Sequence, residues 1–163
     1  MKKIGTLALT LALAGSLTVP ALAAEETAVP ISADTGYGTA LVLNGETLDL
    51  TGIPGVEGEG LLPLRLVAEA DHGSAYWDEE NNESWFYFGD NRITVKFADN
   101  SVWVDDEQVK SQAYVTGGVT FVEAGVLEML EGYTAEQAED GSSITITTPN
   151  NDPMVKAAYQ IME

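Results

Sequence analysis

The chain has 163 residues, no cysteine and a formal net charge of −19, with 26 acidic residues against seven basic ones. A surface this acidic repels nucleic acid and anionic lipid, so we expect neither as a partner. Without disulfide bonds the stability has to come from a hydrophobic core, and the chain is long enough to form one domain with such a core.

Residues 1–23 have the three parts of a cleavable secretory signal peptide. Lys2 and Lys3 form a basic start, an apolar run extends from Ile4 to Val19, and small residues mark a cleavage site at Ala21-Leu22-Ala23. The apolar run is shorter than the ~20 residues of a membrane-spanning helix, which favours cleavage over a retained anchor. We expect a secreted protein, extracellular or loosely associated with the cell wall, because neither a lipid-attachment cysteine nor a wall-sorting pattern follows.

The mature chain would lose the two signal lysines and keep five basic residues, which gives a net charge of −21. Such a charge keeps a secreted protein soluble, and it would also attract cations or a basic partner. Residues 24–38 are small, polar and acidic without a sustained apolar period, so we predict a linker there. The folded domain is predicted over residues 39–149.

Short strands open this domain. Leu41–Leu43 and Thr47–Leu50 flank Asn44-Gly45, a pair of residues typical of a two-residue hairpin turn. A loop rich in glycine and proline follows over residues 52–60. The sequence therefore predicts a β-hairpin ahead of the first helix.

The first helix is predicted to begin with Pro63, which suits a first turn, and to end before Gly73, which can cap it. Apolar residues between them recur at helical spacing. They form one stripe that we expect to be buried: Leu64, Val67 and Ala68.

Three strands joined by tight turns are predicted next, at Trp85–Phe88, Ile93–Phe97 and Val102–Val104. Alternation along each strand assigns the side chains to two faces. The core face would carry Phe86, Phe88, Ile93, Val95, Phe97, Val102 and Val104. The opposite face would carry Trp85, Tyr87, Thr94, Lys96 and Trp103.

The second half of the domain is predicted to contain a strand at Val119–Val122 and then a second helix, ended by Gly132. A further strand is predicted at Ile144–Thr148, and Tyr133–Ala138 is a candidate for another. The core stripe of the second helix would be Val126, Leu127 and Leu130.

The two halves of the domain resemble each other at a spacing of about 60 residues. Leu41–Glu46 corresponds to Val102–Glu107, and Leu61–Leu64 corresponds to Thr120–Glu123. We therefore predict an α+β domain of two degenerate copies of a β-hairpin, strand, helix, strand unit. The copies are expected to share one antiparallel sheet on which the helices pack.

Three segments of the first half resemble the stalk domain found at the N-terminus of copper amine oxidases. They are Leu62–Arg65, Val67–Ala70 and Tyr76–Asp78, to be compared with the family's "VPLR", helical "xIAEALG" and "V-x-W-D". His72 stands where the family usually has its helix-ending glycine, and in the second half the hydrophobic framework is the main match. The resemblance spans about Leu41 to Pro149, and its motifs are specific for the fold rather than for an activity.

The resemblance implies structural roles for the motif residues Pro63, Leu64, Arg65, Glu69, Trp77 and Asp78. Stalk domains are accessory modules of secreted and wall-associated bacterial proteins, so it also implies a non-catalytic binding or spacer module of the cell envelope. The copper site of amine oxidases lies in a separate catalytic domain and requires three histidines and a quinone-forming tyrosine. This chain has one histidine and no Asn-Tyr dipeptide, so we expect neither a cofactor nor a metal.

Motifs of known catalytic sites are missing from the sequence. It contains no G-x-S-x-G, H-E-x-x-H, C-x-x-C or phosphate-binding loop, so we predict that the protein is not an enzyme. A hydrolase that uses two carboxylates is the catalytic alternative. Pairs can always be chosen from 26 acidic residues, so their presence does not discriminate.

Several polar residues have a functional interpretation beside a structural one. His72 could join a metal site or act as a base, but its place at a helix end favours an interaction with the helix dipole. Arg65 could bind an anion, and pairing with a nearby carboxylate such as Asp78 is the simpler prediction. The acidic runs Asp78–Glu83 and Asp105–Glu107 could hold calcium, although solvated turns are favoured.

The candidate ligand or partner surface is the outward set Trp85, Tyr87 and Trp103, because exposed aromatic residues in a row suit sugar stacking or a protein partner. A carbohydrate-binding module for cell-wall polysaccharide is therefore an alternative function, and an envelope protein is another candidate partner. In the competing interpretation this surface is covered, either in a homodimer or by a helical tail over residues 150–163 that begins at Asp152-Pro153.

Overall fold

The computed structural model describes residues 36–152, which belong to the second of two compact units, Asp34–Glu163. The predicted signal peptide 1–23, residues 24–35 of the predicted linker and the predicted tail helix from Pro153 onward lie outside the described residues. The α+β prediction is confirmed, because the described elements are mostly antiparallel strands with few helices.

The described part of the chain contains strands, one short α-helix and two 3-10 helices. In chain order the elements are β1 (Ala40–Leu43), β2 (Glu46–Thr47), β3 (Leu61–Pro63), α1 (Leu64–Ala70), β4 (Ser74–Asp78), β5 (Glu83–Phe88), β6 (Asn91–Lys96), β7 (Ser101–Val104), β8 (Glu107–Gln112), β9 (Tyr114–Thr116), β10 (Val119–Glu123), η1 (Ala124–Met129), β11 (Thr134–Gln137), β12 (Ser143–Thr147) and η2 (Pro149–Asn151). The candidate strand Tyr133–Ala138 is confirmed as β11. Strands β4, β8 and β9 were not expected from sequence periodicity.

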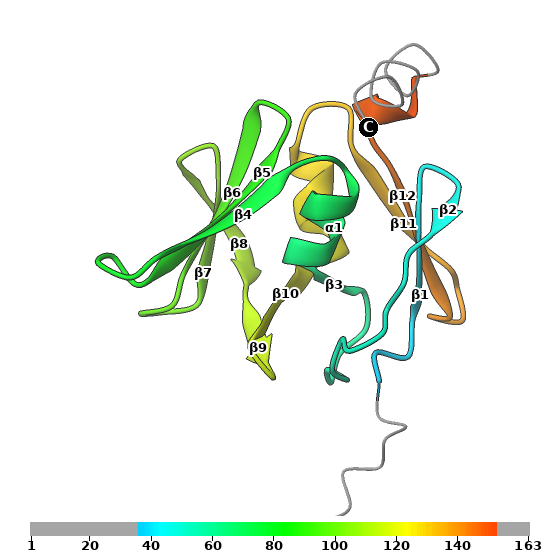
Figure 1. Ribbon diagram of the computed structural model, residues 1–163, viewed down its shortest axis with the longest axis horizontal. Helices are drawn as coiled ribbons and strands as arrows, with labels where there is room; N and C mark the ends of the chain where they lie inside the picture. Colours follow the sequence, from blue (N-terminus) through cyan, green and yellow to red (C-terminus); the bar gives the residue numbers. More distant parts are fainter. Residues whose placement is uncertain (1–35, 153–163) are drawn as a thin grey trace, which may run out of the picture. The chain divides into compact units, whose positions relative to one another are not determined.

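The strands form three sheets, with the orders β11-β12-β1-β2, β3-β10-β9 and β4-β5-β6-β7-β8. Neighbouring strands are antiparallel except β1 and β12, which run parallel with Leu41 opposite Ile144. In Figure 1 the five-stranded sheet is on the left and the four-stranded sheet on the right, with α1 and η1 between them. The prediction of one shared sheet is wrong, because strands from separate sheets bury their apolar sides in one core together with the helices.

Of the strands that the predicted repeat equates, β1 and β7 lie in different sheets, whereas β3 and β10 lie in the same one. β1 of the first half shares the four-stranded sheet with β12 of the second half, and β7 of the second half shares the five-stranded sheet with β5 of the first. β3 and β10 pair directly, with Leu62 opposite Val122. The two halves are therefore interleaved in space (Figure 1), and the repeat itself stays a prediction.

The predicted hairpin turn at Asn44-Gly45 is confirmed. The two residues have positive φ angles of 51° and 88°, as required by the two-residue turn that suits the twist of paired strands. The predicted strand Thr47–Leu50 is too long, since β2 ends at its first residue. Leu48 and Leu50 instead pack against the core from the following loop, so burial rather than strand pairing explains their apolar character.

Helix α1 begins one residue later than predicted. Pro63 is the last residue of β3 and the N-cap of α1, with φ −73° and ψ 99°, instead of a residue of the first turn. Its ring fixes φ at a value that both an extended strand end and a helix start accept. The predicted stripe of Leu64, Val67 and Ala68 is buried.

The end of α1 differs from the prediction that Gly73 caps it. His72 has the left-handed conformation (φ 62°) that glycine usually supplies, and its N–H donates to the Glu69 carbonyl, while the Gly73 N–H donates to the Ala68 carbonyl. A Cβ on Gly73 would lie 1.9 Å from the Tyr87 carbonyl oxygen, so this glycine is required by the close approach of β5. The predicted interaction of His72 with the helix dipole stays a prediction.

The second predicted helix is the 3-10 helix η1 and not an α-helix. Buried Ala124, Leu127 and Leu130 recur at intervals of three, which matches the three residues per turn of a 3-10 helix. Val126 is buried as well, so the predicted core stripe is confirmed although the helix type differs.

The faces predicted for the central strands are confirmed. All residues expected on the core face are buried except Phe97, which is half-buried against the core. Tyr37, in the predicted linker, also packs on the core, and its ring stacks on that of Phe121 with 6.0 Å between the centroids. The ordered packing thus includes the last residues of that predicted linker.

Candidate functional site

The predicted surface residues Trp85, Tyr87 and Trp103 lie on the outer face of the five-stranded sheet, opposite the core. Trp85 pairs with Thr94 of β6, and Thr94 pairs with Trp103 of β7, so the two tryptophans flank a buried threonine in one row across the strands. Tyr76 of β4 is opposite Trp85 and extends this row to the edge of the sheet. Strand alternation identified the face, and the structure adds Tyr76 to it.

The two tryptophan rings on this face are half-buried. The Lys96 ammonium lies 4.0 Å from the ring centroid of Trp103, and the guanidinium carbon of Arg92 lies 5.7 Å from that of Trp85. Both indole N–H groups donate to side chains two residues earlier in the same strand, at 2.8 and 3.0 Å. A neighbouring cation therefore covers part of each ring face, and each indole N–H already donates a hydrogen bond within the chain.

Arg92 is fixed on this face by two partners. Its guanidinium pairs with the Asp106 carboxylate and interacts with the Tyr87 hydroxyl. Burial alone lowers the pKa of Arg92, but the hydrogen bond with Tyr87 and the charge of Asp106 raise it, and the net pKa is above its usual value. Arg92 therefore keeps its charge, which a carboxylate of the same chain balances.

A hollow of about 410 Å³ lies on the outer face beside β4, lined by Ser74, Tyr76, Trp85 and Tyr87. The rings of Tyr76 and Tyr87 meet edge to face, with 5.9 Å between their centroids. Tyr76 is 60% exposed, the largest value for a bulky apolar side chain within residues 36–152. The accessible aromatic surface of this face is thus concentrated next to β4.

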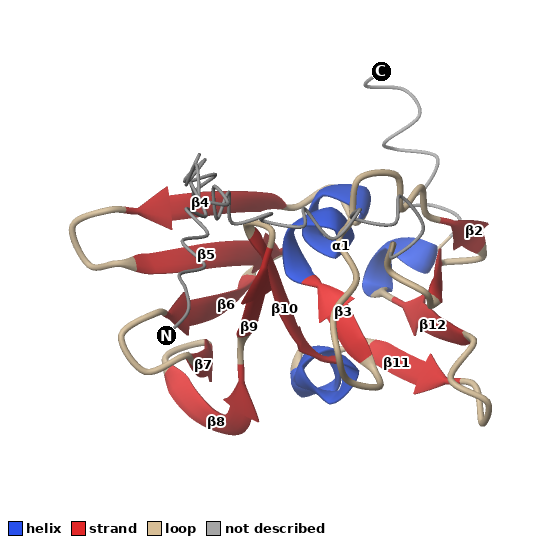
Figure 2. Ribbon diagram, turned by 90° about the horizontal axis from the view of Figure 1, so that it is seen from below, coloured by secondary structure: helices blue, strands red, loops and turns tan. Residues whose placement is uncertain are grey.

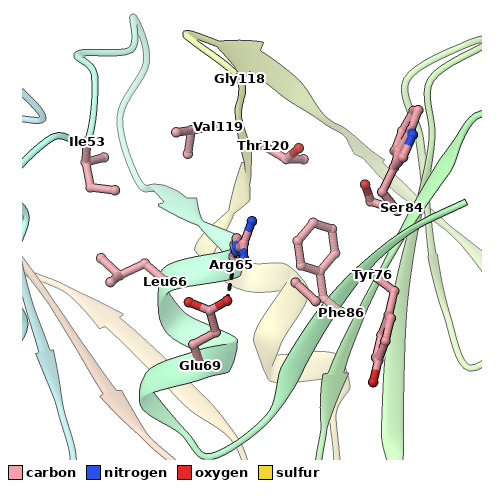
Figure 3. Close-up of a pocket in the computed structure, with 12 residues that line it drawn as sticks. Ile53, Arg65, Leu66, Glu69, Tyr76, Ser84, Phe86, Gly118, Val119 and Thr120 are labelled. Atoms are coloured by element: carbon pink, nitrogen blue, oxygen red, sulfur yellow. Dashed lines mark hydrogen bonds and ion pairs between the residues drawn. The ribbon is translucent and has the colours of Figure 1, made fainter. Parts of the chain in front are cut away.

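A cleft of about 400 Å³ lies on the other side of β4. Figure 3 shows that α1, the five-stranded sheet and β10 contribute its walls. The apolar and aromatic part of the lining consists of Ile53, Leu66, Ala75, Tyr76, Trp77, Phe86 and Val119, so Tyr76 borders both this cleft and the outer hollow. Arg65 and Glu69 of α1 lie side by side at this cleft, joined by the dashed line in Figure 3.

The cleft contains three of the residues that the family resemblance identifies, Arg65, Glu69 and Trp77. Arg65 Nε lies 2.8 Å from Glu69 Oε1, so the predicted pairing of Arg65 with a nearby carboxylate is confirmed, but the partner is Glu69 instead of Asp78. Residues four apart on a helix are neighbours, which makes Glu69 the nearer partner. Trp77 is 55% exposed, and its ring leans on that of Phe97 with 5.4 Å between the centroids.

Asp78 closes the turn between β4 and β5. Its carboxylate accepts hydrogen bonds from the backbone N–H groups of Glu80 and Asn81 and, at 2.8 Å, from the side-chain amide of Asn81. The hydrogen bonds from Asn81 lower the pKa of Asp78. Within residues 36–152, no three His, Cys, Asp or Glu side chains are grouped in a way that could hold a metal ion.

The other acidic run, Asp105–Glu107, forms the turn between β7 and β8. Asp105 and Asp106 have positive φ angles of 45° and 71°, as in a two-residue hairpin turn. The Asp105 carboxylate accepts the backbone N–H of Arg92 at 2.7 Å, and Asp106 pairs with the guanidinium of the same residue. Both aspartates therefore stabilise the turn.

The family resemblance singles out Tyr76 and Trp77, but the sequence-based interpretation predicts neither their strand nor their exposure. Their strand, β4, has only five residues and follows α1 after a short turn. It is therefore too short to show a clear two-residue periodicity in the sequence. The adjacent aromatic residues of Ser74–Asp78, directly after Gly73, were the available signal for a strand.

A family model described as copper amine oxidase N-terminal domain matches residues 42–147, from β1 to the end of β12. No curated protein and no solved structure matches the chain. Among the helices of residues 36–152, none combines the length and the apolar character needed to cross a membrane.

Proposed function

The chain belongs to the copper amine oxidase N-terminal domain family, whose members are non-catalytic domains, and from this we propose that it is a secreted binding or spacer module of the bacterial cell envelope. The predicted signal peptide of residues 1–23 supports export. The family name brings no copper chemistry to this chain, because its single histidine, His72, cannot replace the three that the catalytic domain uses.

The observation that carries the binding function is the exposed aromatic pair of β4. Tyr76 and Trp77 are 60% and 55% exposed, and each borders a hollow of about 400 Å³. Removing apolar surface from water stabilises a complex by roughly 25 cal/mol per Å², so such side chains favour a contact site.

The lining of the cleft supports binding rather than hydrolysis. Glycoside hydrolysis requires two carboxyl groups about 5–9 Å apart. Glu69 is the one carboxylate among the residues that line the cleft, and Arg65 already pairs with it. The hydrolase alternative therefore gains no support from this site.

A carbohydrate-binding module is the second candidate. The outer hollow offers a sugar the rings of Tyr76, Trp85 and Tyr87 together with two phenol hydroxyls, which suits stacking with hydrogen bonding. The Trp103 end of the predicted surface suits it less, because the Lys96 ammonium lies over that ring.

Retention on insoluble cell-wall material tests these functions with the mature chain, residues 24–163. A binding module is expected to stay with the wall and to release no soluble fragments. The sugar-binding candidate is supported if the chain is still retained after wall proteins are removed and if Trp85→Ala/Trp103→Ala abolishes this retention. A protein partner is supported if retention requires the wall proteins. Release of fragments would contradict the non-catalytic function, and a chain that stays inside the producing cell would contradict export.

A further inference from the structure

We propose that the outer edge of β4 is a docking strand, to which an extended basic segment of a partner protein adds as a sixth strand of the five-stranded sheet. This inference rests on the proposed binding function and specifies the chemistry of the partner and the place of contact. Three observations carry it: an edge that has no strand partner among residues 36–152, a hollow on each side of that edge, and acidic residues beside it.

β4 is the terminal strand of the order β4-β5-β6-β7-β8, and within residues 36–152 it pairs with β5 alone. Figure 2 shows it along the margin of the sheet. Natural edge strands are usually protected from further pairing by lysine, proline or a bulge. The register of β4 with β5 is continuous from Ser74 to Asp78, and the strand contains neither lysine nor proline. Its outer edge is therefore able to accept another strand.

The two hollows lie on the two sides of this edge. Successive side chains of an added strand would point alternately to the outer face and to the inner face. On the outer face they would meet Tyr76 and Trp85. On the inner face they would meet the cleft, whose lining includes Trp77 together with Phe86 and Leu66, and the last two are labelled in Figure 3. Main-chain hydrogen bonds would supply affinity, and the hollows would select apolar side chains.

The charges beside this edge favour a basic partner. Glu79 and Glu80 are exposed in the turn that directly follows β4. Arg65, the cation among the cleft-lining residues, is balanced by Glu69. Lysine or arginine residues next to the apolar positions of a partner segment would thus meet unbalanced carboxylates.

A second copy of the chain fits this edge less well than a different, basic chain. Each copy carries a formal net charge of −19, or −21 after loss of the signal peptide, so two copies repel each other. The same charge attracts a basic segment and accelerates its association at low salt.

Selection from a displayed library of random short peptides, with the mature chain as bait, tests the proposal. Enriched peptides are expected to combine apolar residues with lysine or arginine. Isotope-labelled protein is expected to show amide chemical-shift changes at Ser74–Asp78 on peptide binding. Strand β8, at the opposite end of the sheet, should remain unaffected.

Lysines introduced into β4 should block the added strand, as they do in natural edge strands. Tyr76→Lys/Trp77→Lys is expected to weaken binding of the enriched peptide about tenfold or more. Tyr114→Lys is the matched control, because Tyr114 is an exposed aromatic residue on β9, another edge strand, and this variant should bind normally. Glu79→Gln/Glu80→Gln should weaken binding and reduce its dependence on salt. Urea unfolding of each variant shows whether the fold persists.

Equal peptide binding by the folded lysine variant, or enrichment of acidic peptides, would overturn the docking strand. A dimer with protected β4 amides would also overturn it, because a second copy would then occupy the edge. If the chain is retained on wall material but no peptide depends on β4, the docking strand is wrong and the proposed function stands. If retention fails as well, the proposed function is wrong too.

Discussion

The buried carboxylate of Asp71 accepts a hydrogen bond from the buried hydroxyl of Tyr133 at 2.8 Å, across 62 residues of sequence. Its other oxygen accepts hydrogen bonds from the Thr148 hydroxyl at 2.6 Å and the Asn150 amide at 3.0 Å. One carboxylate thus joins the end of α1, the segment before β11 and the segment after β12. A buried network of this kind is stabilising only while every member is satisfied.

Replacement of Asp71 by alanine is expected to lower the free energy of unfolding by about 3 kcal/mol, because the buried hydroxyls of Tyr133 and Thr148 lose the carboxylate they donate to and the Asn150 amide keeps only the backbone carbonyl of residue 71. Tyr133→Phe removes one donor and should cost only about 1 kcal/mol. Urea unfolding of both variants gives the comparison. Equal losses for the two substitutions would show that the carboxylate does not organise the network.

The close approach of Gly73 to β5 predicts a severe effect of a single methyl group. Gly73→Ala is expected to destabilise the fold by about 2 kcal/mol or more, because its Cβ would lie 1.9 Å from the Tyr87 carbonyl oxygen. His72→Gly is the contrasting change, expected to stabilise by up to about 1 kcal/mol by relieving a positive φ. Thermal unfolding of the two variants measures both effects. Unchanged stability of Gly73→Ala would contradict the close approach of Gly73 to β5.

Tyr37 is expected to make stability fall at alkaline pH. Burial raises its pKa from 10.0 to about 12, and its hydroxyl donates to the Leu61 carbonyl. Between these values the unfolded chain loses the phenol proton while the folded chain keeps it, so this contribution is complete below pH 10.0 and is lost as the pH rises towards about 12. Urea unfolding across this pH range should show that the free energy of unfolding declines more steeply with pH for the wild-type protein than for Tyr37→Phe. Parallel declines would disprove the assignment.

The ion pair of Arg65 with Glu69 is expected to contribute little to stability. Both side chains are exposed, by 70% and 50%, so Arg65→Gln should change the free energy of unfolding by no more than about 0.5 kcal/mol. Chemical denaturation measures this change. A large loss would assign Arg65 a structural role in the family motif, and a small one leaves it available to a ligand in the cleft.

Local structure could be predicted from the sequence where it depends on near neighbours. The faces of β5, β6 and β7 follow from alternation, because tight turns join these strands in order. The pairing of β1 with β12 could not be predicted in this way. Asn44 and Thr148, which are hydrogen-bonded at the ends of these strands, are 104 residues apart. Apolar periodicity indicates which residues are buried, but it does not indicate which strand pairs with which.

The same distinction applies to the candidate site. Alternation placed Trp85, Tyr87 and Trp103 on one face, but their accessibility depends on side chains from an adjacent strand. Lys96 of β6 lies over the Trp103 ring of β7. The residue pattern of one strand does not predict such a contact with its neighbour. The family motif includes Tyr76 and Trp77, but their exposure could not be predicted without β4, since exposure at a sheet edge depends on the order of strands.

The parallel pairing of β1 and β12, the first and last strands within residues 36–152, also determines how the domain would respond to mechanical force. A pull that separates the N-terminal end of β1 from the C-terminal end of β12 acts in opposite directions along two parallel neighbours. The hydrogen bonds between them, from Ala40↔Ser143 to Leu43↔Ile146, would therefore be loaded together in shear instead of opening one at a time. Single-molecule stretching through these two ends is expected to show one high-force rupture. A domain under tension at these two ends would thus stay folded until this set of hydrogen bonds breaks.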